Sequence, residues 1–285
     1  MHIVSVEDLY PILKERKKDA EKGEHGRLMI IGGSYGCINA PVLTGISAYR
    51  AGVDAATICT PRRVAPIIQT LSLDVRIREL LSDSFITTKD APLLIEEAKK
   101  HNSVVIGPGG GGNPDTKKTY RRFMGEVKKR MAIDASCISA LKININKINE
   151  MRLVLTPNIK EFRKLTNKNI SNFEEACCEV KKFCKAHRAV IVLKGEKDII
   201  SDGNKLFVNE TGNPGMSCAG TGDVFVGVLG AFMARKIDQF DAATATAFIV
   251  GKAGDELYER YGYGYTASDL ALEIAFTIKR VQDKI

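Results

Sequence analysis

Residues 173–195 of the chain read FEEACCEVKKFCKAHRAVIVLKG, and this stretch contains the pattern that decides the fold. Apolar side chains recur every three or four residues from Phe173 to Cys184, which predicts an amphipathic helix over Phe173–His187. The continuous apolar run Ala189–Leu193 follows, and such a run is typical of a strand buried on both faces of a sheet. A helix that leads into a buried strand indicates a parallel sheet covered by helices.

The same alternation of short apolar runs and helix-length stretches extends along the chain. Five further runs predict strands: Arg27–Ile31, Ala55–Cys59, Val104–Ile106, Met131–Asp134 and Leu153–Thr156. Asp202-Gly203 lies between two more apolar runs and predicts a hairpin turn. Because no repeat, low-complexity tract or linker interrupts this order, we expect residues 1–285 to form one α/β domain, a mostly parallel sheet with helices on both faces.

The composition excludes several classes of protein. With 285 residues, 44% of them hydrophobic and 27% charged, the chain has enough apolar material for a sizeable core, unlike collagen-like or disordered chains. The formal net charge of +8 favours anionic ligands such as phosphates or nucleotides. Seven basic residues between Lys117 and Arg130 are expected on one helix, as a solvated face and not a nucleic-acid site, because no aromatic platform accompanies them.

The cysteines and the apolar runs indicate in which cellular compartment the protein is expected. The seven cysteines are scattered without a C-x-x-C pair, so a disulfide framework or a zinc knuckle is not expected. Glu7 and Asp8 stand where a signal peptide would have its apolar segment, and the run Val224–Ala234 is too short to span a bilayer. We therefore expect a cytoplasmic protein without a membrane partner.

The residues that follow the predicted strands are candidates for a ligand site, because ligands bind at the carboxyl ends of parallel strands. They are Gly32-Gly33-Ser34, Gly107-Pro108-Gly109, Asp134, Pro157-Asn158 and Lys194-Gly195. Lys194 suits a nucleotide phosphate, or it is a solvated strand-end lysine. Glu161 either holds Mg²⁺ through water or only favours the positive end of a helix.

The strongest local signal is Ala219-Gly220-Thr221-Gly222-Asp223, directly before an apolar helix. Two glycines around a threonine expose backbone N–H groups at the positive end of the helix dipole, which predicts an anion hole. Asp223 in the first turn would point at the bound anion, and we expect the helix dipole to lower its pKa. The alternative is ordinary capping by Thr221 or Asp223. The chain has no G-x-x-x-x-G-K-[ST] motif, which excludes a P-loop NTPase.

Taken together and in order, these motifs resemble the NAD(P)H-hydrate dehydratase family, a branch of the ribokinase-like superfamily. The resemblance extends from about His25 to Leu270. It includes Gly32-Gly33-Ser34, Asn39-Ala40-Pro41, Tyr49-Arg50-Ala51-Gly52, Thr60-Pro61, Ile106-Gly107-Pro108-Gly109, Leu193-Lys194-Gly195, Gly212-Asn213-Pro214-Gly215-Met216 and Ala219 to Asp223. It implies a three-layer α/β/α sandwich, and it implies ADP-dependent dehydration of the 6-hydroxy hydrate of NADH or NADPH to NAD(P)H, with release of AMP and phosphate.

The resemblance also implies roles for individual residues. Asp223 would be the catalytic base, and Gly220, Thr221 and Gly222 would form the anion hole. The AMP or ADP positions correspond to Lys194, Gly195, Glu196, Lys197, Asp198 and Gly222. The positions for the hydrated cofactor correspond to Ala40, Gly109, Asn158 and Asp223. Mg²⁺ would accompany ADP, the expected assembly is a homo-oligomer, and a hydrate epimerase on another chain is a candidate partner.

The chain departs from the family pattern at several positions. Asn158 replaces a histidine, Gly110 replaces a leucine, and Asp134-Ala135-Ser136 replaces aspartate-alanine-aspartate. The segment from Thr156 to Glu161 also resembles vitamin kinases of the same superfamily, such as hydroxymethylpyrimidine phosphate kinase. A small-molecule kinase is therefore the alternative enzyme, and a nucleotide-sensing protein is the non-enzymatic alternative.

Overall fold

The computed structural model describes residues 1–13, 16–134, 137–138 and 152–284. Its strands form one ten-stranded sheet in the order β1-β10-β9-β8-β7-β6-β5-β2-β3-β4. The strand bounds are β1 His2–Ile3, β2 Arg27–Ile31, β3 Ala55–Thr60, β4 Arg76–Glu79, β5 Ser103–Ile106, β6 Arg130–Ile133, β7 Arg152–Leu155, β8 Val190–Leu193, β9 Asp198–Ser201 and β10 Leu206–Asn209. All neighbouring pairs are parallel except β8–β9 and β9–β10, so the predicted mostly parallel sheet and the hairpin are both confirmed.

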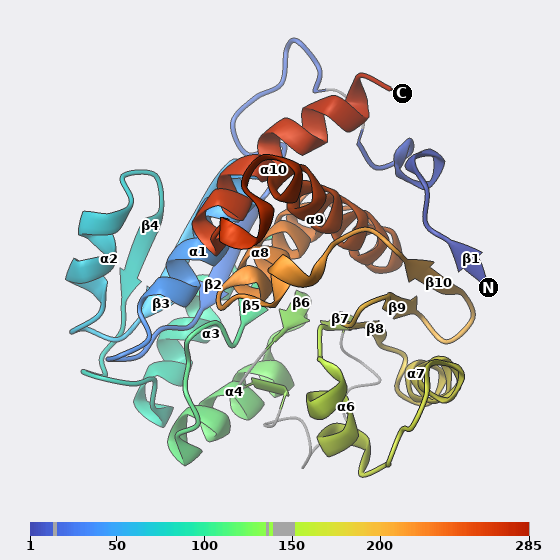
Figure 1. The fold of residues 1–285 in the computed structure, drawn as a ribbon. Coiled ribbons are helices and arrows are strands. Elements are labelled where there is room, and N and C mark those ends of the chain that lie inside the picture. Colours follow the sequence, from blue (N-terminus) through green and yellow to red (C-terminus); the bar gives the residue numbers. More distant parts are fainter. Residues whose placement is uncertain (14–15, 135–136, 139–151, 285) are drawn as a thin grey trace.

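Helices cover both faces of the sheet, as Figure 1 shows. The α-helices are α1 Asn39–Arg50, α2 Ala65–Leu71, α3 Ala91–Ala98, α4 Pro114–Glu126, α6 Ile159–Thr166, α7 Phe173–His187, α8 Thr221–Ala234, α9 Gln239–Tyr261 and α10 Ala267–Gln282. Short 3₁₀ turns are η1 Val6–Leu9, η2 Thr88–Asp90, η5 Pro214–Ser217 and η6 Gly262–Gly264. The predicted helix over residues 173–187 is therefore confirmed.

Two hydrophobic clusters lie on opposite faces of the sheet. In β2, Leu28 and Ile30 pack with α1, α8, α9 and α10, whereas Met29 and Ile31 pack with α3, α4, α6 and α7. The alternation follows from the two-residue period of a strand. The three-layer α/β/α sandwich that the resemblance implied is the observed architecture.

The sequence analysis missed the two edge strands and misplaced part of the basic segment. β4 reads Arg-Ile-Arg-Glu, and this charged composition is typical of an edge strand and gives no continuous apolar run. Helix α4 ends at Glu126, so Lys128, Lys129 and Arg130 do not extend its basic face. Arg130 starts β6, and its guanidinium donates to the carbonyl of Ile237 at 2.7 Å. None of the helices in the described part of the chain has the length and hydropathy needed to cross a membrane.

Candidate active site at the carboxyl ends of the central strands

The glycine-threonine-glycine sequence begins helix α8. Gly220 is its N-cap residue at a φ of 99°, in the left-handed region that favours glycine, and a Cβ there would lie 2.8 Å from side-chain atoms of Leu43 and Ala267. No side chain caps this helix. The Thr221 hydroxyl instead donates backward to the carbonyls of Met216 and Cys218 at 2.7 and 3.0 Å. The capping interpretation is therefore wrong, and no side chain of the described residues accepts a hydrogen bond from the first-turn N–H groups.

The pKa of Asp223 is the opposite of what the sequence analysis expected. The pKa of Asp223 is raised to about 7, first by burial and then by the neighbouring Asp134 carboxylate, while Lys194 acts in the opposite direction. The helix dipole is weaker than the cost of holding the charge away from water. A carboxylate with a pKa near neutrality is well matched to accept a proton from a hydroxyl group.

Lys194 is paired with a buried carboxylate and is not the solvated lysine that the sequence also allowed. Its Nζ lies 3.0 Å from Oδ1 of Asp134, and the same oxygen accepts a hydrogen bond from Thr156 at 2.6 Å. A Cβ on Gly222 would lie 3.4 Å from Nζ of Lys194 and 3.7 Å from Oδ2 of Asp134. The ends of β6, β7 and β8 thus meet the start of α8.

The role of Asp134 is the part of the site that the sequence analysis missed. Its position directly after a strand was noted, but no function was assigned to it. Only the fold brings it beside Lys194, which lies 60 positions further along the chain. Residues 135 and 136, which complete the departure from the family pattern there, lie outside the described residues.

A cavity of about 640 Å³ opens next to Gly222. Five of the six predicted nucleotide positions line it, together with Asn158: Lys194, Gly195, Glu196, Asp198 and Gly222. Phe225 of α8 and Ala247, Val250 and Gly251 of α9 contribute an apolar wall, and residues 211–214, 216, 217 and 221 complete the lining. An apolar wall with a few polar groups at one end is typical of a small-molecule site.

Two charged positions of the predicted nucleotide segment differ in environment. Lys197 does not line the cavity, and its Nζ lies 2.6 Å from a carboxylate oxygen of the exposed Glu210. Asp198 accepts hydrogen bonds from the N–H of Gly195 and the side chain of Asn209 at 3.1 and 3.2 Å. Burial raises the pKa of Asp198 to about 6. Asp198 therefore holds the Gly195 turn in place.

Asn158 and Glu161 form a capping box at the start of α6. Oδ1 of Asn158 accepts from the N–H of Glu161 at 2.9 Å, and Oε2 of Glu161 accepts from the N–H of Asn158 at the same distance. Asn158 therefore lines the cavity with its oxygen already engaged. One oxygen of Glu161 is engaged as well, which agrees with the helix-end alternative and leaves its second oxygen for a water-bridged ion.

The glycine loops after β2 and β5 meet at Gly109. A Cβ on Gly109 would lie 2.7 Å from the carbonyl oxygen of Cys37 and 3.2 Å from Cβ of Ala40. Ser34 donates its hydroxyl hydrogen to the Gly109 carbonyl at 2.8 Å. Burial first, and then the charge of Asp223, raises the pKa of Cys37, so this cluster lies within electrostatic reach of Asp223.

Thr44 connects this cluster to helix α8. Its hydroxyl lies 3.0 Å from the carbonyl oxygen of Ala40 and 3.1 Å from that of Asp223. Ala40, Gly109 and Asp223, which the resemblance assigned to the hydrated cofactor, are thus neighbours in the fold. Asn158 lies on the side of the 640 Å³ cavity instead.

The structure explains why Gly110 replaces a leucine. A Cβ on Gly110 would lie 2.0 Å from the hydroxyl oxygen of Tyr120, a fully buried side chain of α4. Among the described residues, Tyr120 and Thr60 have the only buried side-chain hydroxyls without a hydrogen-bond partner. A Cβ on Gly33 would lie 2.5 Å from Oγ1 of Thr60, so each hydroxyl lies against one of the two glycine loops.

The chain is similar to known proteins of one family. The sequence profile of the NAD(P)H-hydrate dehydratase family matches residues 28–275. The chain belongs to the NAD(P)H-hydrate dehydratase family. It is 37% identical to the bifunctional NAD(P)H-hydrate repair enzyme Nnr of Pyrobaculum aerophilum, over 93% of this chain and 53% of that protein. The chain therefore spans about half the length of the first curated relatives that it matches.

Other members of the NAD(P)H-hydrate dehydratase family match over their whole length. The ADP-dependent (S)-NAD(P)H-hydrate dehydratase of Cenarchaeum symbiosum is 28% identical over 94% of this chain and 93% of its own. The structure of the ADP/ATP-dependent NAD(P)H-hydrate dehydratase of Bacillus subtilis, co-crystallized with ATP/Mg²⁺, superposes with a TM-score of 0.81. The superposition covers 99% of this chain and 98% of the Bacillus subtilis chain, and the two sequences are 20% identical. At this identity the comparison shows that the two proteins share a fold.

Proposed function

We propose that the chain catalyses ADP-dependent dehydration of the hydrate of NADH or NADPH. Hydroxide is a poor leaving group, so the hydrate hydroxyl first takes the terminal phosphoryl group of ADP, which leaves as AMP. Phosphate then departs with the C–O bonding electrons, and a ring proton is lost as the double bond re-forms. Membership of the family supports this reaction, and we propose that residues 1–285 act as one domain.

The observation that carries the proposal is the position of Asp223 in the first turn of α8, three residues after the left-handed Gly220. In the proposed reaction Asp223 removes the proton of the hydrate hydroxyl as the phosphoryl group arrives. The N–H groups of Gly220, Thr221 and Gly222 bind the oxygens of the transferring phosphoryl group. Lys194 and the cavity beside Gly222 hold ADP.

We propose that Mg²⁺ enters with the nucleotide. Within the described part of the chain, no cluster of three or more His, Cys, Asp and Glu side chains could hold a metal ion. That fits Mg²⁺, which is usually held by substrate phosphates, water and one or two carboxylates. The second oxygen of Glu161 could bind such an ion through water. When bound, the ion would neutralise charge on the ADP phosphates.

The remaining assignments follow from the same proposal. The substrates are ADP and the hydrated dinucleotide, and no nucleic acid is involved. We propose a cytoplasmic homo-oligomer. The relatives named bifunctional suggest a hydrate epimerase as a partner, on a separate chain.

The test is to incubate the purified protein with ADP, Mg²⁺ and NADH hydrate and to follow the absorbance of reduced nicotinamide. We expect NADH, AMP and phosphate in equal amounts. A parallel reaction offers hydroxymethylpyrimidine phosphate with ATP. Phosphorylation of the pyrimidine without recovery of NADH would replace the proposal by the kinase alternative. Binding of ADP without turnover of either substrate would favour the nucleotide-sensing protein.

A further inference from the structure

An exposed tyrosine lies beside the glycine loops. Tyr35 is 60% exposed and occupies a tight turn in which Ser34 and Cys37 form an isolated antiparallel bridge. Ser34 and Cys37 both contact Gly109. Tyr35 directly follows Ser34, and adjacent Cα atoms are about 3.8 Å apart, so Tyr35 lies next to the residues that we propose bind the hydrate.

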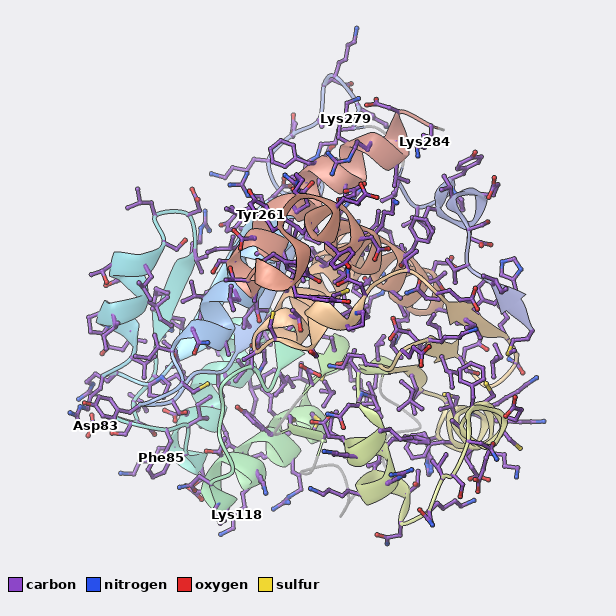
Figure 2. The ribbon with its side chains drawn as sticks, viewed as in Figure 1. Asp83, Phe85, Lys118, Tyr261, Lys279 and Lys284 are labelled. Atoms are coloured by element: carbon purple, nitrogen blue, oxygen red, sulfur yellow. The ribbon has the colours of Figure 1, made fainter. Side chains whose placement is uncertain are left out.

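Arg63 stacks on this tyrosine. The centre of its guanidinium lies 4.5 Å from the ring centroid. Both partners are held by the segment that contains Asp83 and Ser84. The N–H of Tyr35 donates to the carbonyl of Ser84 at 2.7 Å, and the N–H of Arg63 donates to the carbonyl of Asp83 at 3.0 Å. Figure 2 labels Asp83 and Phe85 at this corner of the molecule. The stacked pair is therefore anchored by backbone hydrogen bonds at both ends.

Arg63 differs from its neighbour in its ionic contacts. Arg62 lies 3.4 Å from a carboxylate oxygen of Glu79. Arg63 makes no ion pair with any carboxylate of the described residues, that of the adjacent Asp83 included. An exposed guanidinium that is held on an aromatic ring and lacks an anion is suited to bind a phosphate group.

The proposed reaction requires such a site. Its substrate is a dinucleotide, and only the hydrated nicotinamide ring has to reach Asp223. ADP occupies the 640 Å³ cavity in the same turnover, so the adenosine half of the dinucleotide must bind elsewhere. The Tyr35 turn adjoins Gly109 and Ala40, and neither of these residues lines that cavity.

We propose that Tyr35 and Arg63 form the subsite for the adenosine half of the dinucleotide, with Arg63 binding the 2′-phosphate that distinguishes NADPH hydrate from NADH hydrate. The adenine base stacks on this pair, because both an aromatic ring and a guanidinium plane offer a face to a base. The proposal rests on the proposed function. It makes the chain selective for the phosphorylated substrate.

The kinetic test compares Arg63→Ala with Arg62→Ala as the matched control. We expect Arg63→Ala to lower kcat/KM for NADPH hydrate about tenfold or more, a typical loss for a charge-assisted contact, with a change of less than about threefold for NADH hydrate. The KM for ADP should not change. If Arg63→Ala loses kcat/KM equally on NADPH hydrate and NADH hydrate, the assignment of the 2′-phosphate is overturned. If Arg63→Ala keeps the wild-type kcat/KM on both substrates, the subsite is overturned. Arg62→Ala should behave like the wild type.

A binding test separates this inference from the proposed function. Adenosine 2′,5′-bisphosphate is titrated by calorimetry into wild type, Arg63→Ala and Tyr35→Ala with saturating ADP present to fill the other cavity. Binding to the wild type that is weakened about tenfold in both variants supports the subsite, even if no hydrate is turned over. No binding to the wild type, or equal binding to all three proteins, would overturn it.

Discussion

The two sides of the candidate site are built differently. On the proposed nucleotide side, residues that follow β8 and residues of α8 and α9 line a cavity of about 640 Å³, and two of its charged groups, Lys194 and Asp198, already have partners. On the glycine-loop side, residues 32–34 and 107–112 contribute mainly backbone, and two buried hydroxyls beneath them have no hydrogen-bond partner among the described residues. The cavity is therefore already formed and its polar groups are held in place, whereas the loop side retains polar groups that no described residue satisfies.

Asp223 lies where the two sides meet, so replacing it should have the largest effect. We expect Asp223→Asn to lower kcat by about 10²–10⁴-fold, the usual contribution of a general base, while ADP binding is retained. Turnover assays measure kcat, and calorimetry on the same preparation measures ADP binding. Full turnover by the variant would remove Asp223 from the mechanism.

The raised pKa of Asp223 also predicts an effect of pH on stability. The group is held protonated in the folded state up to about pH 7, whereas the unfolded chain releases the proton near pH 4. The wild type should therefore lose stability as the pH rises from about 4 to 7, and Asp223→Asn should not show this loss. Thermal unfolding should give the variant a Tm a few degrees higher at pH 8 and a similar Tm at pH 4. A gap in Tm that is independent of pH would contradict the raised pKa.

On the nucleotide side, Lys194→Ala should weaken ADP binding more than hydrate binding. Loss of a charge-assisted contact to phosphate corresponds to roughly 10–100-fold in affinity. Lys160, an exposed lysine of α6, is the matched control, and Lys160→Ala should bind ADP like the wild type. Unchanged ADP affinity with a collapse in hydrate affinity would reverse the assignment of the two sides.

Asn158 tests where the two sides divide, because it lines the cavity although the resemblance assigns it to the hydrated cofactor. Asn158→Ala should raise the KM for the hydrate more than it lowers kcat, because an asparagine side chain can position a substrate but does not titrate. Loss of the N-cap should also cost about 1 kcal/mol of unfolding free energy. Asn158→Asp retains a capping oxygen and should recover that stability, and Asn158→His should remain active. Loss of kcat at saturating substrate in Asn158→Ala would exclude a positioning role.

The smallest effect is expected beneath the glycine loops. Tyr120→Phe removes a buried hydroxyl that has no hydrogen-bond partner in the described part of the chain, so the free energy of unfolding should rise by about 1 kcal/mol. Chemical denaturation measures the change. A Phe variant that is less stable than the wild type would show that the hydroxyl has a partner, such as a buried water.

The layers of this protein could be predicted from the sequence alone. Continuous apolar runs such as Ala189–Leu193 predict buried strands because a parallel strand has no solvent-facing side, and the glycines around Thr221 predict backbone N–H groups without a covering side chain at the start of a helix. The left-handed conformation of Gly220 at that helix start was seen only in the structure. The edge strand β4 escaped prediction because its solvent-facing residues carry charge.

Only the tertiary structure decided the electrostatics of the site. The sequence analysis expected a lowered pKa for Asp223 because the helix dipole is a local property. Burial and the distant Asp134 reversed that expectation. Likewise, Lys194 and Asp134 form a pair only because their strand ends lie at the same edge of the sheet. Charges act through space, and their distances and degree of burial are set by how the elements pack.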